Sequence, residues 1–366
     1  MRVLREELSV AARNAKNATD AVKSITEAHK CFKLEEKDSR LCITACGPAQ
    51  IYAEVLLDAE ELAGWKPVLV NAEVFTNILA KLPDSDSLEI TQDDRMLTIK
   101  AKGVRLTLNI VQTDFPQKED WSDVRYEGKV DFLEDLGSVI HAVSVSAEKN
   151  PMMSSVHMCL SKTGYRVEAL DGHRISRRER DFAKESEEEA PVKFLIQGVL
   201  VNRILRMING KECTIKVDNT KVAFEGEDTF IQCPISNQEY FKVDQMFDAI
   251  KMVSEAIIDK ENLSSAMDLI LLYGTSSDKA PAKFSLKDGT LAISSVTSAF
   301  GDTNSSPKAR VSGVDIEIML RADYVQDAVK SLPGDEVRIL FSNPKAPVLM
   351  GGDGKYEMLL PVYDKK

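Results

Sequence analysis

The alternation of apolar and polar positions along the chain predicts one structural pattern three times. In each case an amphipathic helix stops within two residues of a Pro or Gly and leads into an alternating strand. These helix–strand pairs are at 75–82 and 87–91, at 201–208 and 213–217, and at 324–332 and 337–341. The last apolar residues of the helices, Leu82, Ile208 and Leu332, are 126 and 124 residues apart, close to one third of the 366 residues. This spacing predicts three copies of one unit.

Each unit is predicted to contain a second amphipathic helix near its start, followed by short strands. Apolar residues fall on one helical face at 4–15, 132–147 and 246–258. Polar joints at 114–123 and 236–244 separate the units. We therefore expect the α+β class, with two helices packed on antiparallel sheet in each repeat. The expected domains are 1–125, 126–243 and 244–366.

Composition and charge narrow the classes of protein that fit. Hydrophobic residues make up 43% of the chain, enough to build cores, and no apolar run is long enough to cross a bilayer. The segment Met1–Glu7 turns acidic at once, so we expect no signal peptide, no membrane and a cytoplasmic location. The net charge of −11 argues against a surface covered by nucleic-acid-binding residues, although a local basic face is compatible with it.

No cofactor or metal site is indicated by the residue pattern. The six cysteines form no CxxC pair, and the four histidines are scattered, so we expect reduced structural thiols. Nucleotide-binding and hydrolase motifs are absent. One tetrad, Asp171-Gly-His-Arg174, follows a predicted strand at 165–170. It fits a tight turn in which Gly172 permits an unusual backbone angle and Asp171 caps the chain. The alternative is a metal-assisted hydrolase centred on Asp171 and His173.

Basic residues lie on or at the ends of the predicted helices. They are Arg5, Arg13, Lys16, Lys81, Lys149, Arg203, Arg206, Lys251 and Lys330. Such residues are commonly no more than a solvated face. The functional interpretation is that the helices present them to one polyanion through phosphate contacts, which carry no sequence information.

Taken together, these features resemble a known family. The chain has three repeats, with Asp171-Gly-His-Arg-Ile in the second, Arg321-Ala-Asp-Tyr-Val in the third and Leu359-Leu-Pro-Val362 near the end. On these residues the chain resembles the bacterial DNA polymerase III β subunit, the β sliding clamp. Thr113-Asp-Phe-Pro116 followed by Trp121 resembles that family's first interdomain joint. The family's usual Leu-Pro-Ile-Leu segment is absent, and Asp20–Ile25 stands in its place, which indicates a divergent member.

The resemblance implies a head-to-tail homodimer whose six domains close a ring around double-stranded DNA. It implies a processivity factor for DNA replication, non-catalytic and without cofactor or metal, associated with the nucleoid and loaded by a separate ATP-using clamp loader. A pocket would bind short peptide motifs of DNA polymerase, the clamp loader and repair proteins. Gln238, Lys242 and Leu170 depart from the family's usual residues, so a clamp paralogue with a specialised partner set is a further alternative.

The resemblance also implies site residues. The partner-peptide pocket would comprise Leu170, Gly172, His173, Arg174, Ile175, Lys242, Val243, Tyr324, Leu359, Leu360, Pro361 and Val362. The DNA contacts would come from Arg13, Lys16, Lys149, Arg203 and Arg206. The dimer interface would join Leu106 and Leu108 of one chain to Ile270, Leu271 and Leu272 of the next, with ordinary core packing as the competing explanation for these apolar residues.

Overall fold

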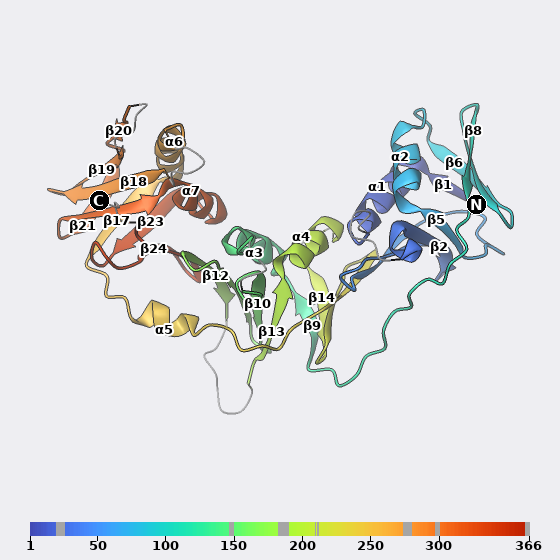
Figure 1. Ribbon diagram of the computed structural model, residues 1–366, viewed down its shortest axis with the longest axis horizontal. Coiled ribbons are helices and arrows are strands. Elements are labelled where there is room, and N and C mark those ends of the chain that lie inside the picture. Colours follow the sequence, from blue (N-terminus) through green and yellow to red (C-terminus); the bar gives the residue numbers. More distant parts are fainter. Residues whose placement is uncertain are drawn as a thin grey trace. The chain divides into compact units, whose positions relative to one another are not determined.

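The computed structural model describes residues 1–19, 26–145, 150–181, 190–208, 210, 212–273, 280–296 and 301–362. The chain divides into two compact units, whose elements are drawn in Figure 1. Unit 1 comprises Met1–Glu134 and Val199–Asn237, and unit 2 comprises Asp135–Gly198 and Gln238–Lys366. Because both units take part of the predicted second domain, the three domain boundaries stay a prediction.

The described residues of unit 1 form two antiparallel sheets and three helices. The helices are α1 (Arg5–Lys16), α2 (Ala72–Lys81) and α4 (Gly198–Met207), with a 3-10 turn at Glu27–Lys30. The first sheet has the order β1-β6-β7-β8, from β1 (Arg2–Leu4), β6 (Ser87–Gln92), β7 (Met96–Ala101) and β8 (Val104–Asn109). The second has the order β5-β2-β3-β4-β16-β15-β14-β9, from β5 (Val68–Asn71), β2 (Cys31–Lys37), β3 (Arg40–Cys46), β4 (Tyr52–Leu57), β16 (Thr229–Pro234), β15 (Lys221–Glu225), β14 (Cys213–Val217) and β9 (Tyr126–Val130).

Unit 2 has the same kinds of element. Its helices are α3 (Leu133–Ser138, which begins at the boundary), α5 (Val243–Asp248), α6 (Lys260–Leu271) and α7 (Ala322–Ser331), with a 3-10 turn at Ile140–Ala142. One sheet has the order β13-β10-β11-β12-β25-β24-β23-β17-β21, from β13 (Val192–Gln197), β10 (Ser155–Leu160), β11 (Tyr165–Leu170), β12 (Arg174–Arg180), β25 (Lys355–Leu359), β24 (Val348–Gly352), β23 (Glu336–Phe341), β17 (Ser254–Asp259) and β21 (Ala309–Gly313). The other has the order β20-β19-β18-β22, from β20 (Asn304–Ser305), β19 (Thr290–Ser295), β18 (Pro281–Lys287) and β22 (Ile316–Arg321).

The predicted repetition is present in the order of pairing. In the first two repeats the first strand pairs with the sixth, followed by the seventh and eighth, and the fifth pairs with the second, followed by the third and fourth. The third repeat has the same order with one additional strand, β21, which pairs with β17 at the edge of its sheet. Two large sheets arise because the fourth strand of one repeat pairs with the last strand of the next. In unit 1 this joins β4 to β16, with Tyr52 opposite Gln232. In unit 2 it joins β12 to β25, with Arg174 opposite Leu359.

The predicted helix at 246–258 is wrong. Its first part overlaps α5, which ends at Asp248, and its second part is the strand β17, which lies between β23 and β21. Over so short a segment the apolar spacing fits both periods, and the β-branched Val253, Ile257 and Ile258 favour a strand. The helix of this repeat follows at once: Asp259 caps α6 by accepting a hydrogen bond from the amide of Asn262 at 2.9 Å. Lys251 therefore lies on no helix.

The predicted helix at 132–147 is shorter than expected. The six residues of α3 are followed by a 3-10 turn, and 143–145 are not helical. The helices predicted at 4–15, 75–82, 201–208 and 324–332 correspond to α1, α2, α4 and α7. The described cysteines are free and buried, as expected for structural thiols. None of the helices described is both long and apolar enough to span a membrane.

Candidate peptide-binding site

The turn between β11 and β12 forms the centre of the predicted pocket. Asp171 Oδ1 accepts hydrogen bonds from the backbone N–H groups of His173 at 2.9 Å and Arg174 at 3.1 Å. Gly172 has a φ of +88°, a conformation that L side chains rarely adopt. The turn is therefore held by the chemistry that the tetrad predicts, and Arg174 leaves it as the first residue of β12.

Arg174 links this turn to helix α7. Its guanidinium donates to Asp171 Oδ2 at 3.0 Å, to Asp327 Oδ2 at 2.6 Å and to the carbonyl of His141. The same group lies 4.2 Å from the ring centroid of Tyr324, a cation–π contact. Because these partners come from three separate segments of unit 2, the side chain of Arg174 is fixed in position before any ligand arrives.

Tyr324 is flanked by a second arginine. The guanidinium of Arg321 lies 3.8 Å from the ring centroid and donates to the phenol oxygen at 2.9 Å. The ring of His173 is 6.3 Å away, tilted by 54°. Burial, together with the charge of Asp171, raises the pKa of Tyr324. The phenol thus stays neutral and presents a polarised ring between basic groups.

The C-terminal segment runs beside the turn. The N–H of Leu360 donates to the carbonyl of His173 at 2.9 Å, and the N–H of Val362 donates to the carbonyl of Met319 at 2.9 Å. Leu359 is buried in the core of the third repeat, whereas Leu360 is 41% exposed and Pro361 is half-buried. An apolar side chain held at the surface in this way is available to a partner.

A small apolar cluster lies beneath this segment. Leu170, Ile175 and Val243, all predicted for the pocket, share it with Leu195, Tyr240 and Met358. Partly buried side chains pack around it, namely Met152, Met153, Phe241, Phe247, Ile250 and Leu349. The adjacent Met152 and Met153 were not predicted for this cluster; their flexible thioethers can adapt to the shape of what packs against them. Lys242, also predicted, is exposed at the start of α5.

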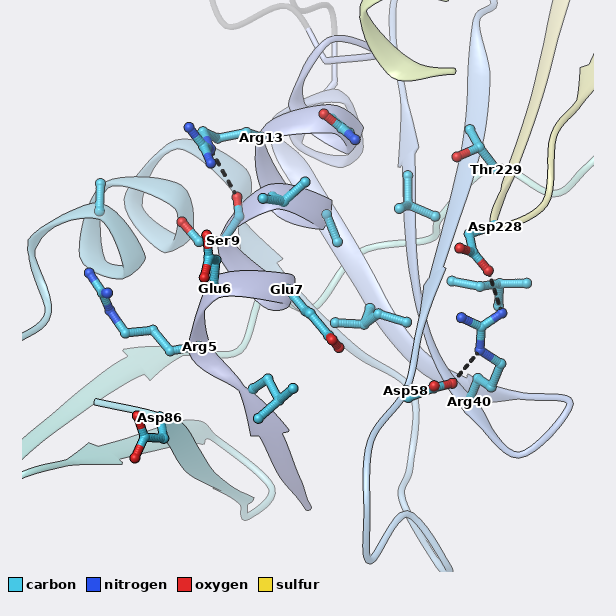
Figure 2. A pocket seen from close by; sticks show the side chains of 18 of the residues that line it. Arg5, Glu6, Glu7, Ser9, Arg13, Arg40, Asp58, Asp86, Asp228 and Thr229 are labelled. Atoms are coloured by element: carbon cyan, nitrogen blue, oxygen red, sulfur yellow. Dashed lines mark hydrogen bonds and ion pairs between the residues drawn. The ribbon is translucent and has the colours of Figure 1, made fainter. Parts of the chain in front are cut away.

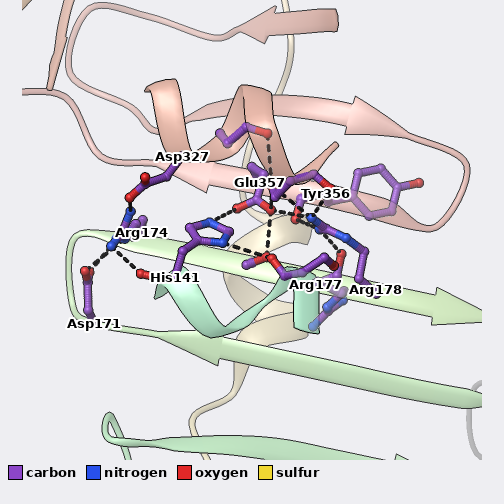
Figure 3. A network of polar contacts seen from close by, with 12 residues as sticks. His141, Asp171, Arg174, Arg177, Arg178, Asp327, Tyr356 and Glu357 are labelled. Atoms are coloured by element: carbon purple, nitrogen blue, oxygen red, sulfur yellow. Dashed lines mark hydrogen bonds and ion pairs between the residues drawn. The ribbon is translucent and has the colours of Figure 1, made fainter. Parts of the chain in front are cut away.

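A buried polar network supports the site from the β12–β25 junction (Figure 3). Glu357 is fully buried and pairs with the equally buried Arg178 at 2.6 Å. Its Oε1 also accepts from the hydroxyls of Ser176 at 2.7 Å and Ser331 at 2.8 Å, and its Oε2 lies 3.1 Å from His141 Nε2. Burial would raise the pKa of Glu357, but the hydrogen bond and charge of His141 and the charge of Arg178 hold that pKa below its usual range.

The linker helix α5 is fixed by charge as well as by packing. Asp244 accepts from Arg177 at 2.7 Å and from Arg166 at 3.1 Å. Burial opposes its ionisation, yet the charges of Arg177 and Arg166 keep the pKa of Asp244 lowered. Because Val243 precedes Asp244, these two ion pairs place a predicted pocket residue against the apolar cluster.

Unit 1 contains a different concavity, beside α1 (Figure 2). It has a volume of about 1010 Å³, and its walls come from α1, from β4 and from the turn that holds Asp228. Arg40 closes one side by pairing with Asp58 at 2.8 Å and Asp228 at 2.6 Å. Arg13, on the same wall as Arg5, donates to the carbonyl of Ser9 at 3.3 Å.

Comparison with known proteins gives consistent results. Residues 250–358 match the family model of the DNA polymerase III beta subunit, C-terminal domain. The beta sliding clamp of Bacillus subtilis is 23% identical over 308 residues, covering 81% of this chain and 80% of the relative. That of Staphylococcus aureus is 22% identical over 340 residues, covering 90% and 88%.

Solved structures agree over the whole chain. A Pseudomonas aeruginosa sliding clamp bound to griselimycin superposes with a TM-score of 0.89 at 15% identity, covering 100% of this chain and 99% of that one. A putative DNA polymerase III beta subunit from Eubacterium rectale gives 0.85 at 22% identity, covering 99% and 98%. The chain has the fold of a DNA polymerase III β subunit. The predicted α+β class and the predicted resemblance to a divergent sliding clamp are confirmed.

The hydrolase alternative gains no support from this clamp fold. Asp171 already accepts three hydrogen bonds within its own turn and from Arg174. Within the part of the chain that the structure describes, no three His, Cys, Asp or Glu residues are grouped so that they could hold a metal ion. The tetrad is a structural turn on which the side chain of His173 is exposed.

The residues predicted to contact DNA in a clamp fall on two helices of unit 1. Arg13 and Lys16 lie on the last turns of α1, where Lys16 is 3.7 Å from Glu73. Arg203 and the exposed Arg206 lie on α4. Lys149 lies outside the described residues.

The residues predicted for the clamp dimer interface differ in exposure. Leu106 and Leu108 lie on β8, the edge strand of its sheet; Leu106 is half-buried and Leu108 is buried. At the end of α6, Ile270 belongs to the core of the third repeat and Leu271 packs against that core. Leu272 is 78% exposed, and Leu269 on the same helix is 48% exposed.

Proposed function

We propose that the chain is a DNA sliding clamp: two copies close head to tail around duplex DNA and tether DNA polymerase and other partners through short peptides. The observation that carries the proposal is the repeated junction between repeats. The fourth strand of one repeat pairs with the last strand of the next, as β4 with β16 and β12 with β25.

The same pairing, applied once more, joins two chains. The eighth strand of the first repeat, β8, is an edge strand, and β20 occupies the fourth-strand edge of the third repeat. Unpaired strand edges invite association, and a head-to-tail contact forms a ring when its rotation closes. Pairing β20 of one chain with β8 of the next makes every junction alike, and two chains supply six repeats. Leu272, exposed at the end of α6, would cover part of this contact.

Duplex DNA would be held without base recognition. Arg13, Lys16, Arg203 and Arg206 supply cations for phosphate contacts, and Lys149 is proposed with them from the sequence alone. Few and salt-sensitive contacts allow sliding, because none fixes a base register. Retention then comes from ring closure, so the chain needs no reaction of its own. A separate ATP-using loader would open the ring, in the cytoplasm at the nucleoid.

Partner peptides would bind between the Asp171–Arg174 turn and Leu360–Val362. The cluster of Leu170, Ile175 and Val243 offers apolar burial, while Arg174 and Tyr324 present donors and an aromatic face. Peptides with a glutamine and apolar anchors, as carried by polymerases, clamp loaders and repair proteins, suit this combination.

The association of two chains into a ring is tested by the mass in solution and by cross-linking. Sedimentation equilibrium should give a species of twice 40.6 kDa, and a strict monomer at tens of micromolar would contradict the proposal. The pair Thr107→Cys with Asn304→Cys places new thiols on β8 and β20, and the native cysteines are buried, so background reaction is low. Oxidation should link the double variant into dimers, whereas Lys66→Cys with Asn304→Cys should remain unlinked.

A further inference from the structure

The solvent face of the sheet β1-β6-β7-β8 carries a row of charged residues. Strand register places Arg2 opposite Glu89, Glu89 opposite Lys100, and Lys100 opposite Arg105. Lys102, at the turn between β7 and β8, stands beside this row. These residues line a concavity of about 450 Å³ together with Ser87 and the short side chains of 101–104.

The row is strongly positive although the protein is acidic. Four cations face one carboxylate here, whereas the whole chain has a net charge of −11. Glu89 pairs with Lys100 at 2.8 Å. Among the residues that the structure describes, the side chains of Arg2, Lys102 and Arg105 meet no ion-pair or hydrogen-bond partner. Unpaired like charges repel one another, so such a row is stabilised by an anion that lies across it.

The geometry of the row is fixed by the sheet. Alternation sends Leu88, Ile90, Leu97 and Ile99 to the opposite, fully buried face. The charged residues therefore stand on a rigid surface, and their spacing follows from the distance between strands. Three spacings of about 4.8 Å give a row of about 14 Å.

We propose that this surface binds the phosphodiester backbone of a nucleic-acid strand, at a site separate from the helices assigned to duplex DNA. A length of about 14 Å matches roughly four nucleotides at about 3.4 Å each. The two guanidiniums of Arg2 and Arg105 suit phosphate oxygens, which they can grip with paired donors. The lining contains no aromatic side chain for base stacking, so binding would not depend on sequence.

A protein partner fits the surface less well. Interfaces between proteins bury aromatic and large apolar residues at their centre and exclude charge there. The concavity offers only Ala101, Gly103 and Val104 as apolar lining. An acidic peptide would have charge complementarity but no anchor, whereas a phosphodiester chain needs only the charges.

The test is oligonucleotide binding by the full chain. Fluorescence anisotropy with a labelled 20-nucleotide oligothymidylate would measure binding by the native protein and by a double variant that carries both Arg2→Glu and Lys102→Glu. Neither residue belongs to edge strand β8, so chain association should be preserved, and sedimentation checks this. The matched control is Lys66→Glu with Arg95→Glu, which changes the net charge equally at exposed positions of the same repeat. If Arg2→Glu disturbs β1, the double variant that combines Lys100→Glu and Lys102→Glu makes the same charge change in the same concavity, and neither residue belongs to β8.

The patch variant should bind at least about tenfold more weakly at low salt, and its slope of log affinity against log salt should be smaller by about 1 to 2. The control should stay within about twofold, since no phosphate contact is removed. An equal loss of oligonucleotide affinity in the patch variant and in the control variant would overturn the proposed site. So would competition by polyglutamate as strong as that by unlabelled oligonucleotide of equal charge, which would indicate an acidic protein ligand. Retention on circular duplex DNA reports ring function separately and should be unchanged in the patch variant.

Discussion

Removal of the buried carboxylate of Glu357 should destabilise unit 2 strongly. Glu357→Leu leaves Arg178, which is fully buried, without its counter-charge and takes the acceptor from Ser176, Ser331 and His141. Removing one partner of a buried ion pair costs about 3–5 kcal/mol. We expect a loss of that size in the free energy of unfolding, because no other described carboxylate pairs with Arg178.

The assay is guanidinium unfolding followed by far-UV circular dichroism. Both tryptophans, Trp65 and Trp121, belong to unit 1, so their fluorescence serves as an internal reference. The control is Glu336→Leu: this exposed carboxylate pairs with Arg310, and its loss should lower the free energy of unfolding far less than the loss of Glu357 does.

A double variant separates charge from packing. Arg178→Met with Glu357→Leu removes both buried charges and should recover about 2 kcal/mol or more relative to Glu357→Leu alone. The reasoning is refuted if Glu357→Leu costs no more than Glu336→Leu, or if the double variant is as unstable as the single one.

Four further results are expected. Folding lowers the pKa of Glu357, so the ionised carboxylate stabilises the folded state above its unfolded pKa of about 4.3, and this stabilisation is lost as pH falls through the folded pKa. Unfolding curves between pH 6 and 3 should therefore show a smaller loss of stability with acid in Glu357→Gln than in the native protein. Leu360→Asp should weaken a polymerase-type peptide about tenfold or more in anisotropy titrations, whereas Leu269→Asp, of similar exposure, should not. Leu272→Glu should raise the dimer dissociation constant about tenfold in sedimentation, with Met246→Glu as the neutral control. Burial raises the pKa of Cys42 to about 11, so Ellman's reagent should modify the thiols only on unfolding, and rapid labelling of the native protein would contradict this.

The sequence predicted correctly those helix ends and turns that are formed by contacts between residues close together in the chain. Helix α2 begins where Asn71 caps it, accepting from the amide of Val74 at 3.0 Å, and ends before Pro83. The Asp171–Arg174 turn likewise forms through contacts within four residues. The segment 246–258 was predicted wrongly because its preference was decided by β23 and β21, strands far away in the chain.

The supporting network of the site could not be predicted in the same way. Glu357 meets His141, Ser176 and Arg178 across about 180 to 216 residues of sequence. Nothing near Glu357 in the chain distinguishes it from the other carboxylates. Arg321 is different: its position two residues before Asp323 and three before Tyr324 is a local signal, and both contacts are formed.

Topological retention on DNA tests the central claim most directly. The chain would be mixed with closed circular plasmid at a concentration below its dimer dissociation constant, concentrated so that dimers form, and separated from free protein by gel filtration in high salt. Half of the sample would then be linearised. The account predicts that the protein stays with circular DNA and leaves linear DNA. Equal retention on both forms, or release from both by a protein that is dimeric under these conditions, would contradict it.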